Sequence, residues 1–284
     1  MSLRRTFLIL IALAALLAIW GYATAVSVPI VRQARLDLPR WPAGAPPVKA
    51  VLISDIHVIG PDMPPERLHR IVAQINALNL DVVLIAGDLI SDKRTSTRHY
   101  SMAEAIAPLT GLRPRLGSFA VLGNHDHWRN AGEARQALKA AGVRLLGNEA
   151  AAAGPLVIGG LDDDYTENSD LPGTLAKMAR MKGARLILSH SPDPFPDVPR
   201  DVPLMVAGHT HCGQVSLPFY GAVRTFSRHG KRYECGIYKE GGKTLVITAG
   251  LGTSGVPLRL GAVPDMWLLE LGPIRSDGAR SPRR

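Results

Sequence analysis

Five short apolar runs in this chain each end in a small residue that is followed by a side chain able to bind a metal. These side chains are Asp55, Asp88, Asn124, His190 and His209. Short runs rich in β-branched residues and leucine are typical of strands that are buried on both faces. Open α/β sheets carry their functional residues just outside the carboxyl ends of such strands. The pattern therefore predicts an α/β fold in which the five strand ends converge on one rim.

Two of these strand ends carry a second potential ligand two positions further on. His57 follows Asp55 in this way, and His211 follows His209. Extended backbone sends residues i and i+2 to the same side, so each pair can present two ligands to one point. Each short piece alone is also ordinary turn sequence, and only the five together indicate a site. Nitrogen and oxygen ligands without thiolates favour two divalent transition metals (Mn, Fe, Co or Zn) over Mg or Ca.

The assembled pattern resembles the signature of the calcineurin-like metallophosphoesterases. It consists of Asp55-x-His57, Gly87-Asp88, Gly123-Asn124-His125-Asp126, His190 and Gly208-His209-Thr210-His211. The resemblance covers residues 48–272 and implies a four-layer α/β/β/α sandwich. Residues 209–215 and 250–255 resemble the membrane-associated bacterial branch, which includes UDP-2,3-diacylglucosamine pyrophosphatase-like and twin-arginine-exported phosphoesterases. His127 departs from this pattern, because an aromatic residue is expected there.

The resemblance also implies a role for each residue of the pattern. It places Asp55, His57, Asp88 and His211 around one metal, and Asp88, Asn124, His190 and His209 around the other. Asp88 would bridge the metals, because a carboxylate has four lone-pair sites and an imidazole has one. Metal-bound hydroxide would attack the phosphorus of the substrate. His125 would stabilise the transition state or protonate the leaving oxygen, with Asp126 as its orienting partner.

The expected substrate is a phosphodiester or a pyrophosphate. The most specific hypothesis is a lipid-linked substrate such as UDP-2,3-diacylglucosamine in lipid A synthesis. The alternatives are a general phosphodiesterase of the cell envelope and a non-catalytic metal-binding module of the envelope. A full ligand set together with His125 favours an enzyme, because a decayed site should have lost at least one position.

The N-terminus carries an apolar segment, residues 6–26, that holds no charge. At about 1.5 Å per residue it can cross a hydrocarbon core of about 30 Å. Ala23-Thr24-Ala25 resembles a signal-peptidase site, and Arg4-Arg5 resembles a twin-arginine export signal. We favour a retained single-pass anchor in a bacterial inner membrane, because the segment is longer than the usual apolar region of a signal peptide. Arginines flank both ends of the segment, so both orientations remain open.

We divide the chain into four parts. Residues 1–27 are a membrane anchor or signal, 28–47 a proline-rich linker, 48–272 the metallophosphoesterase domain, and 273–284 a basic disordered tail. The net charge of +9 comes partly from the flanks of the apolar segment and from the tail. Basic flanks of this kind fit anionic lipid, and nucleic acid is not an expected partner. The sequence leaves the oligomeric state open.

Periodicity and composition give the remaining expectations. Apolar spacing predicts a helix over residues 64–78 with His69 on its solvated side, and further helices over 133–141 and 173–181. Strands are expected over residues 244–249 and 266–271. Asp162, Asp163 and Asp164 are expected to form a solvated turn, and Asp92 a solvated loop position. Cys212 and Cys235 are interpreted as free thiols.

Overall fold

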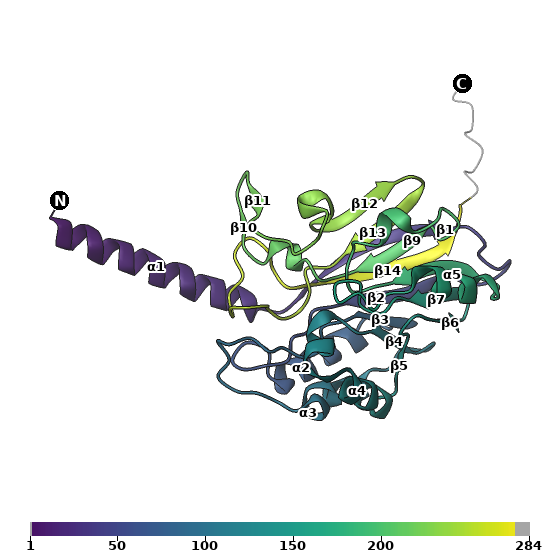
Figure 1. The fold of residues 1–284 in the computed structure, drawn as a ribbon, viewed down its shortest axis with the longest axis horizontal. Coiled ribbons are helices and arrows are strands. Elements are labelled where there is room, and N and C mark those ends of the chain that lie inside the picture. The colour runs from purple at the N-terminus through teal and green to yellow at the C-terminus, as the bar shows by residue number, and fades with distance from the viewer. Residues whose placement is uncertain (1, 276–284) are drawn as a thin grey trace, which may run out of the picture.

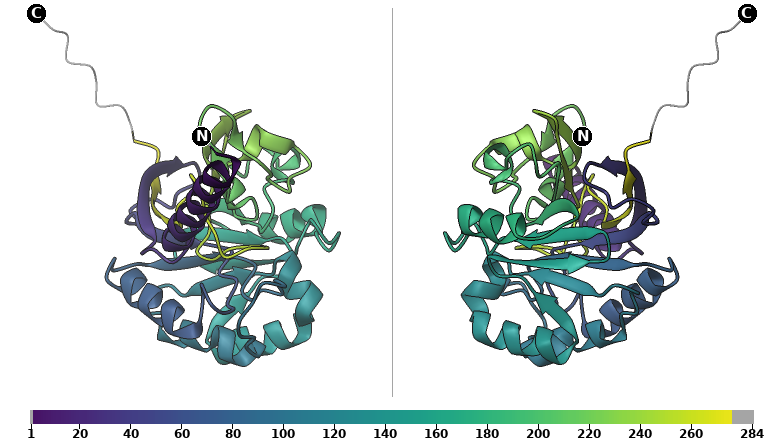
Figure 2. Two further views of the ribbon diagram at one scale, coloured as in Figure 1. Left: turned by 90° about the vertical axis from the view of Figure 1, so that its left-hand side faces the viewer. Right: turned by 90° about the vertical axis from the view of Figure 1, so that its right-hand side faces the viewer.

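The chain folds into two six-stranded sheets that pack face to face, with helices on both outer faces (Figures 1 and 2). The computed structural model describes residues 2–275. Leu52 and Leu84 of one sheet and Leu186 and Val206 of the other are fully buried in the cluster between the sheets. This arrangement confirms the four-layer α/β/β/α sandwich.

The first sheet has the strand order β1-β14-β2-β3-β4-β5. The strands are β1 (Ile30–Leu38), β14 (Asp265–Pro273), β2 (Val48–Ile53), β3 (Val82–Ala86), β4 (Ser118–Val121) and β5 (Val143–Leu145). From β2 to β5 neighbouring strands are parallel, and β14 runs antiparallel to β2. The outer face is covered by α2 (Pro65–Asn76), α3 (Met102–Ile106) and α4 (Asn124–Ala140).

The second sheet has the order β12-β13-β9-β8-β7-β6. Its strands are β12 (Gly236–Glu240), β13 (Lys243–Ile247), β9 (Leu204–Ala207), β8 (Ala184–Leu188), β7 (Leu156–Gly160) and β6 (Glu149–Ala153). The four central strands are parallel, and α5 (Leu171–Ala179) lies on the outer face. Smaller elements are η1 (Ala107–Gly111), η2 (Phe195–Asp197), η3 (His211–Gly213), η4 (Gly230–Tyr233), and the hairpin of β10 (Ser216–Leu217) with β11 (Gly221–Ala222).

Helix α2 confirms the helix that the apolar spacing predicts. Leu68, Ile71, Val72 and Ile75 lie on one face of the helix and are buried, whereas His69 is exposed as expected. A proline in the first turn suits the helix start, because the amide it lacks would have no partner inside the helix. The helices expected over 133–141 and 173–181 are also present. Each begins earlier than expected, as α4 and α5.

The expected linker over residues 28–47 is wrong in its first half. Strand β1 pairs in parallel with β14 along its whole length, from Ile30 opposite Asp265 to Leu38 opposite Pro273. Leu36 and Leu38 are buried in the core between the sheets. The prolines that indicated a linker begin only after this strand, at Pro39. Residues 30–38 therefore belong to the folded domain.

Helix α1 (Leu3–Ala25) projects from the domain, and only Gly21 and Ala25 at its base are buried (Figure 1). Within the described residues it is the one helix long and apolar enough to cross a membrane, with a mean hydropathy of 2.3. At the other end of the chain, residues 276–284 of the expected basic tail lie outside the described residues.

The interpretation of the cysteines as free thiols is also wrong. Cys212 and Cys235 form a disulfide, with their Cα atoms 4.8 Å apart. Cys212 follows β9 by five residues, and Cys235 directly precedes β12. The bond therefore fixes the start of β12 beside the loop that carries His211. Sequence could not show this proximity, because it depends on how the second sheet is assembled.

Candidate metal centre

The metal-ligating residues predicted from sequence lie together at one edge of the sandwich. Strands β2, β3 and β4 of the first sheet and β8 and β9 of the second end there. Asp55, Asp88 and His209 adopt positive φ angles of 48°, 53° and 68° just past their strands. Positive φ is uncommon for residues other than glycine, although Asp and His tolerate it better than most, and such conformations cluster at functional sites. Here the turns send the side chains inward from both sheets, and all of the predicted ligands are buried.

A first group of potential ligands comprises Asp55, His57 and His211, whose ligand atoms lie within 4.8 Å of one another. His57 Nε2 lies 3.1 Å from His211 Nε2, and Asp55 Oδ1 lies 3.3 Å from His211 Nε2. Burial lowers the pKa of both His57 and His211 well below the ordinary histidine value. Both rings therefore stay neutral, and each keeps a lone pair for a metal.

A second group surrounds His190. Its Nε2 lies 3.1 Å from Asn124 Oδ1 and 3.1 Å from His209 Nδ1. Its Nδ1 donates a hydrogen bond of 2.8 Å to the carbonyl of Ala86, which directs Nε2 toward the group. Burial alone would lower the pKa of His190, but the nearby carboxylates, Asp88 first among them, together outweigh it and raise that pKa well above the ordinary value. A metal ion beside Nε2 would take the place of that proton.

Asp88 lies between the two groups. Its Oδ2 is 3.4 Å from His57 Nε2 in the first group and 3.3 Å from His190 Nε2 in the second. Its Oδ1 accepts a hydrogen bond of 2.9 Å from the backbone N–H of His125, which fixes the plane of the carboxylate. One oxygen of Asp88 thus faces histidines from both sheets.

The donor set fits divalent cations. Asp55 Oδ1 and His209 Nε2 are buried and have no hydrogen-bond partner among residues 2–275. The other oxygen of Asp55 accepts from the Ser54 hydroxyl and from the backbone N–H of His209, so Oδ1 is the one left to bind a cation. Buried oxygen and imidazole lone pairs that converge at 3.1–3.3 Å repel one another unless protons or cations lie between them.

His125 lies in the first turn of α4, where its ring packs edge-on against His57 and Trp128. Its Nδ1 is 2.6 Å from Asp92 Oδ1, which leaves Nε2 available for proton transfer. The ring is also close enough to His57 and Asp88 to join them around a metal. Asp92, expected to be solvated, is 41% exposed but holds this histidine.

The expected contact between Asp126 and His125 is not the one that the structure shows. The Asp126 carboxylate accepts from the backbone N–H groups of Gly123, Leu89 and Ile90. These hydrogen bonds join the start of α4 to the loop after β3. Asp126 therefore positions the helix and forms no hydrogen bond with the His125 ring. Asp92 takes the place next to the imidazole of His125.

The expected solvated turn at Asp162–Asp164 is wrong for its first two residues. Asp162 and Asp163 are buried, and Asp162 Oδ1 lies 2.7 Å from His127 Nε2. The hydrogen bond to Asp162 raises the pKa of His127. His127, the residue that departs from the family pattern, is therefore held in an ion pair with Asp162. It does not line the cavity that opens onto the metal-binding residues.

A cavity of about 210 Å³ opens onto these ligands. Aromatic side chains that the sequence did not single out, Trp128, Tyr165 and Phe226, form part of its wall. A neighbouring cavity of about 670 Å³ shares Tyr165 and Phe226 with it and is lined further by Arg224 and Lys231. The two cavities therefore share an aromatic wall, and the second carries both basic and acidic side chains, the acidic ones being Asp164, Glu167 and Asp193.

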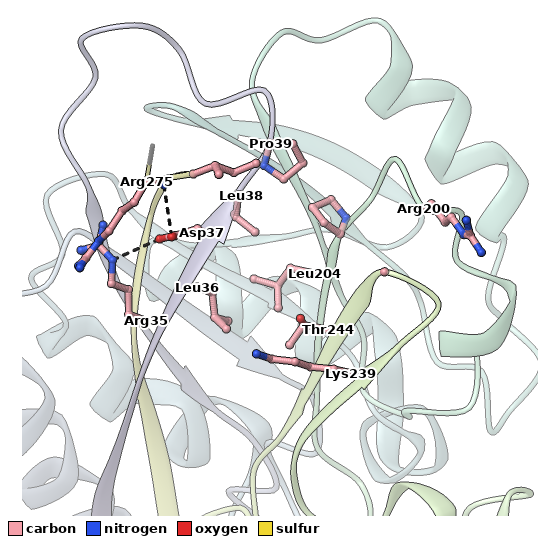
Figure 3. Close-up of a pocket in the computed structure, with 13 residues that line it drawn as sticks. Arg35, Leu36, Asp37, Leu38, Pro39, Arg200, Leu204, Lys239, Thr244 and Arg275 are labelled. Carbon is pink, nitrogen blue, oxygen red and sulfur yellow. Dashed lines mark hydrogen bonds and ion pairs between the residues drawn. The ribbon is translucent and has the colours of Figure 1, made fainter. Parts of the chain in front are cut away.

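A further cavity, of about 600 Å³, lies between β1 and strands β9 and β13 (Figure 3). Leu36 and Leu204 lie along it, and Lys239 reaches toward it. None of the predicted metal ligands lines this cavity. Its position excludes it as the substrate site of the metal centre.

Arg259 is a fully buried side chain beside the metal-binding residues that sequence reasoning missed. Its guanidinium donates to the carbonyls of Ala249 and Gly252, and its Nη2 lies 3.4 Å from His211 Nδ1. These backbone acceptors take the place of a carboxylate partner. No sequence signal marked it, because its partners are backbone atoms of a loop.

The fold and the paired ligand groups define a metallophosphoesterase. The family model for calcineurin-like phosphoesterases matches residues 48–213, so the chain belongs to that family. It is 32% identical over 240 residues to an uncharacterized metallophosphoesterase, YkuE, of Bacillus subtilis, covering 81% of each chain.

Two vertebrate relatives are longer proteins. The chain is 31% identical over 277 residues to a zebrafish "transmembrane protein with metallophosphoesterase domain", covering 91% of this chain and 61% of the relative. The cattle protein of the same name is 27% identical over 276 residues, covering 90% of this chain and 60% of the relative. The chain thus spans about three fifths of these two relatives.

Proposed function

We propose that this chain is a membrane-anchored binuclear phosphohydrolase that cleaves a phosphodiester or pyrophosphate bond in a lipid-linked substrate. Membership of the metallophosphoesterase family supports the reaction class. The observation that carries the binuclear assignment is the position of Asp88 Oδ2, within 3.4 Å of a histidine in each ligand group.

The proposed residue roles follow from this geometry. Asp55, His57 and His211 would hold one metal, Asn124, His190 and His209 the other, and Asp88 would bridge them. When bound, two divalent ions lower the pKa of a shared water and bind the phosphoryl oxygens. We propose Mn, Fe, Co or Zn, since the donors are oxygen and imidazole.

The proposed proton donor to the leaving oxygen is His125. Asp92 holds its Nδ1, so the Nε2 proton is free to move to the departing group. Asp126 would act indirectly by positioning the first turn of α4. The aromatic wall of Trp128, Tyr165 and Phe226 would exclude water around the reacting group.

The lipid-linked substrate is proposed from α1. An anchor of this length would confine the catalytic domain to a membrane surface, and we propose a bacterial inner membrane. The Cys212–Cys235 disulfide favours placing the domain outside the cytoplasm, because such bonds persist in oxidising compartments. A nucleotide-linked substrate such as UDP-2,3-diacylglucosamine would require the cytoplasmic side. We therefore favour an envelope phosphodiesterase that acts on lipid headgroups.

The test combines metal dependence with topology. The full chain, stripped with chelator and reloaded with Mn²⁺, should regain hydrolysis of bis(p-nitrophenyl) phosphate in proportion to bound metal, up to two ions per chain. Protease added to spheroplasts should cleave the domain. Activity that is unaffected by chelation would disprove the metal mechanism. A domain that resists protease in spheroplasts would lie in the cytoplasm, and a nucleotide-linked substrate would then be favoured over a lipid headgroup.

A further inference from the structure

The segment over residues 215–233, here called the basic hairpin segment, contains the β10–β11 hairpin and has an unusual surface. Its exposed large apolar side chains are Leu217, Phe219, Tyr220, Val223 and Phe226. It also holds four cations, Arg224, Arg228, Lys231 and Arg232, and no carboxylate. Clustered apolar side chains on a surface mark an interaction site, and flanking cations favour an anionic partner.

The hairpin begins at the base of α1. The backbone N–H of Ser216 donates to the carbonyl of Leu260 at 2.7 Å, and the N–H of Arg259 donates to the carbonyl of Gly21 at 3.0 Å. Gly21 packs so closely against this strip that a Cβ there would lie 3.3 Å from Leu260. One short strip of chain thus contacts both the last turns of the anchor and the root of the hairpin. Figure 1 shows both at the same end of the domain.

The anchor itself indicates the level of the membrane surface. Trp20 and Tyr22 are exposed on the part of α1 nearest the domain. Tryptophan and tyrosine are enriched where a spanning helix leaves the hydrocarbon core, at the depth of the lipid headgroups. Gly21 lies between them and contacts the strip that carries the hairpin. The hairpin root therefore lies at headgroup depth if α1 spans the bilayer.

The cations of the segment are arranged for an interface between lipid and water. Lys231 Nζ lies 3.3 Å from the ring centroid of Tyr220, and the Arg224 guanidinium lies 4.2 Å from that of Phe226. Arg228 and Arg232 pair with Asp164 and Glu240. Arg224 and Lys231 form no ion pair within residues 2–275, although Lys231 Nζ donates a hydrogen bond of 2.7 Å to the carbonyl of Tyr220. Their other N–H donors can therefore meet lipid phosphates. Aromatic rings beside such cations are typical of segments that lie in the headgroup layer.

We propose that the basic hairpin segment inserts into the headgroup layer of the leaflet next to the domain, as a second membrane contact beside α1. The partner is a bilayer surface containing anionic lipid. Phe226 of the same segment lines the catalytic cavity, so this contact would hold the mouth of the cavity against the headgroups. The inference rests on the anchor of the proposed function and is independent of which phosphoester is cleaved.

The first test measures depth in the membrane. The full chain is reconstituted into phosphatidylcholine–phosphatidylglycerol vesicles with an environment-sensitive NBD label on Phe219→Cys. The matched control is Ile274→Cys, an exposed apolar position one residue past the end of β14. Lipids spin-labelled near the headgroup should quench the label at position 219 at least about threefold more than at position 274. Equal quenching at both positions would overturn the proposal.

The second test measures what the contact does. Phe219→Ser should lower hydrolysis of a phospholipid embedded in the vesicles by about five- to tenfold, because the cavity loses its orientation to the surface. Hydrolysis of bis(p-nitrophenyl) phosphate should stay within about twofold, which also reports correct folding. Ile274→Ser should change neither rate. An unchanged rate of phospholipid hydrolysis in Phe219→Ser would overturn the role of the segment.

The two proposals fail separately. If the label at position 219 is quenched but no phospholipid is hydrolysed by the unaltered chain, the membrane contact stands and the lipid substrate fails. If phospholipid is hydrolysed while the label at position 219 stays unquenched, the contact fails and the lipid substrate stands.

Discussion

The metal centre and the basic hairpin segment depart from ordinary protein architecture in opposite ways. At the centre, carboxylates and imidazoles are buried, and several atoms such as Asp55 Oδ1 have no hydrogen-bond partner among residues 2–275. In the segment, apolar side chains such as Phe219 are exposed. Both arrangements are costly in water unless something else covers these groups. The difference indicates what each region binds: cations at the centre and a lipid surface at the segment.

Asp88→Asn should have the largest effect. The substitution removes a negative charge and one of the two equivalent oxygens from the residue that faces both ligand groups. We expect turnover to fall by at least about 10³-fold, with loss of at least one metal per chain. Elemental analysis and hydrolysis of bis(p-nitrophenyl) phosphate measure the two quantities. Near-normal turnover with two bound metals would rule out a bridging role.

His125→Ala should have the next largest effect. We expect turnover to fall by about 10²–10⁴-fold, the usual contribution of a positioned acid, while metal content stays near that of the unaltered chain. A good leaving group such as p-nitrophenolate needs little protonation, so the loss should be smaller on that substrate than on an alkyl phosphodiester.

Metal analysis of the same variant separates the two roles that the geometry allows for His125. The ring lies within reach of a metal held by His57 and Asp88. Loss of metal from His125→Ala, with equal damage on both kinds of leaving group, would reassign this residue as a ligand.

Asp92→Asn should have a smaller effect on the same chemistry. Its carboxylate lies 2.6 Å from His125 Nδ1 and is partly exposed, so an amide can retain a weaker hydrogen bond. We expect about a tenfold loss of turnover, unchanged metal content and the same dependence on leaving group as His125→Ala. Glu133→Gln on the exposed face of α4 serves as the control. Full activity in Asp92→Asn would show that Asp92 does not orient His125 for catalysis.

The ligands of the metal centre could be predicted from sequence because each follows its own strand directly. An apolar run, a small residue and a ligand form a local pattern, and parallel strands bring their carboxyl ends to one edge. The partner of His125 is not local in this sense. Asp92 lies 33 residues before it on a separate loop, and only the packing of that loop against α4 joins the two. Asp126, one residue away, was the natural but wrong expectation.

Strand β1 shows the same limit for the fold. Its burial follows no simple alternation along the strand, because only Leu36 and Leu38 at its end are buried. Its partner β14 lies more than 200 residues further along the chain. The prolines at residues 39–47 favour a linker, but residues 30–38 before them form a strand of the first sheet. The disulfide of Cys212 and Cys235 was missed for the same reason, since both cysteines are brought together by the second sheet.

The smallest effect is expected from removing α1, and it tests whether the two regions are independent. A chain beginning at Ser27 keeps β1 and the carbonyl that accepts a hydrogen bond from Arg67. It should hydrolyse bis(p-nitrophenyl) phosphate within about twofold of the full chain, because the ligands come from strands of the domain itself. A loss of tenfold or more would mean that the anchor supports the metal centre, through the Gly21 contact with the strip leading to Arg259.

A chain beginning at Ala43 is the control that distinguishes the anchor from the first strand. It also lacks β1, and with it the buried Leu36 and Leu38. Their burial contributes about 3–6 kcal/mol, a large part of the stability of a typical domain. This variant should therefore unfold at a lower urea concentration than the Ser27 variant or fail to stay soluble. Equal urea midpoints for the two variants would return residues 30–38 to the role of a linker.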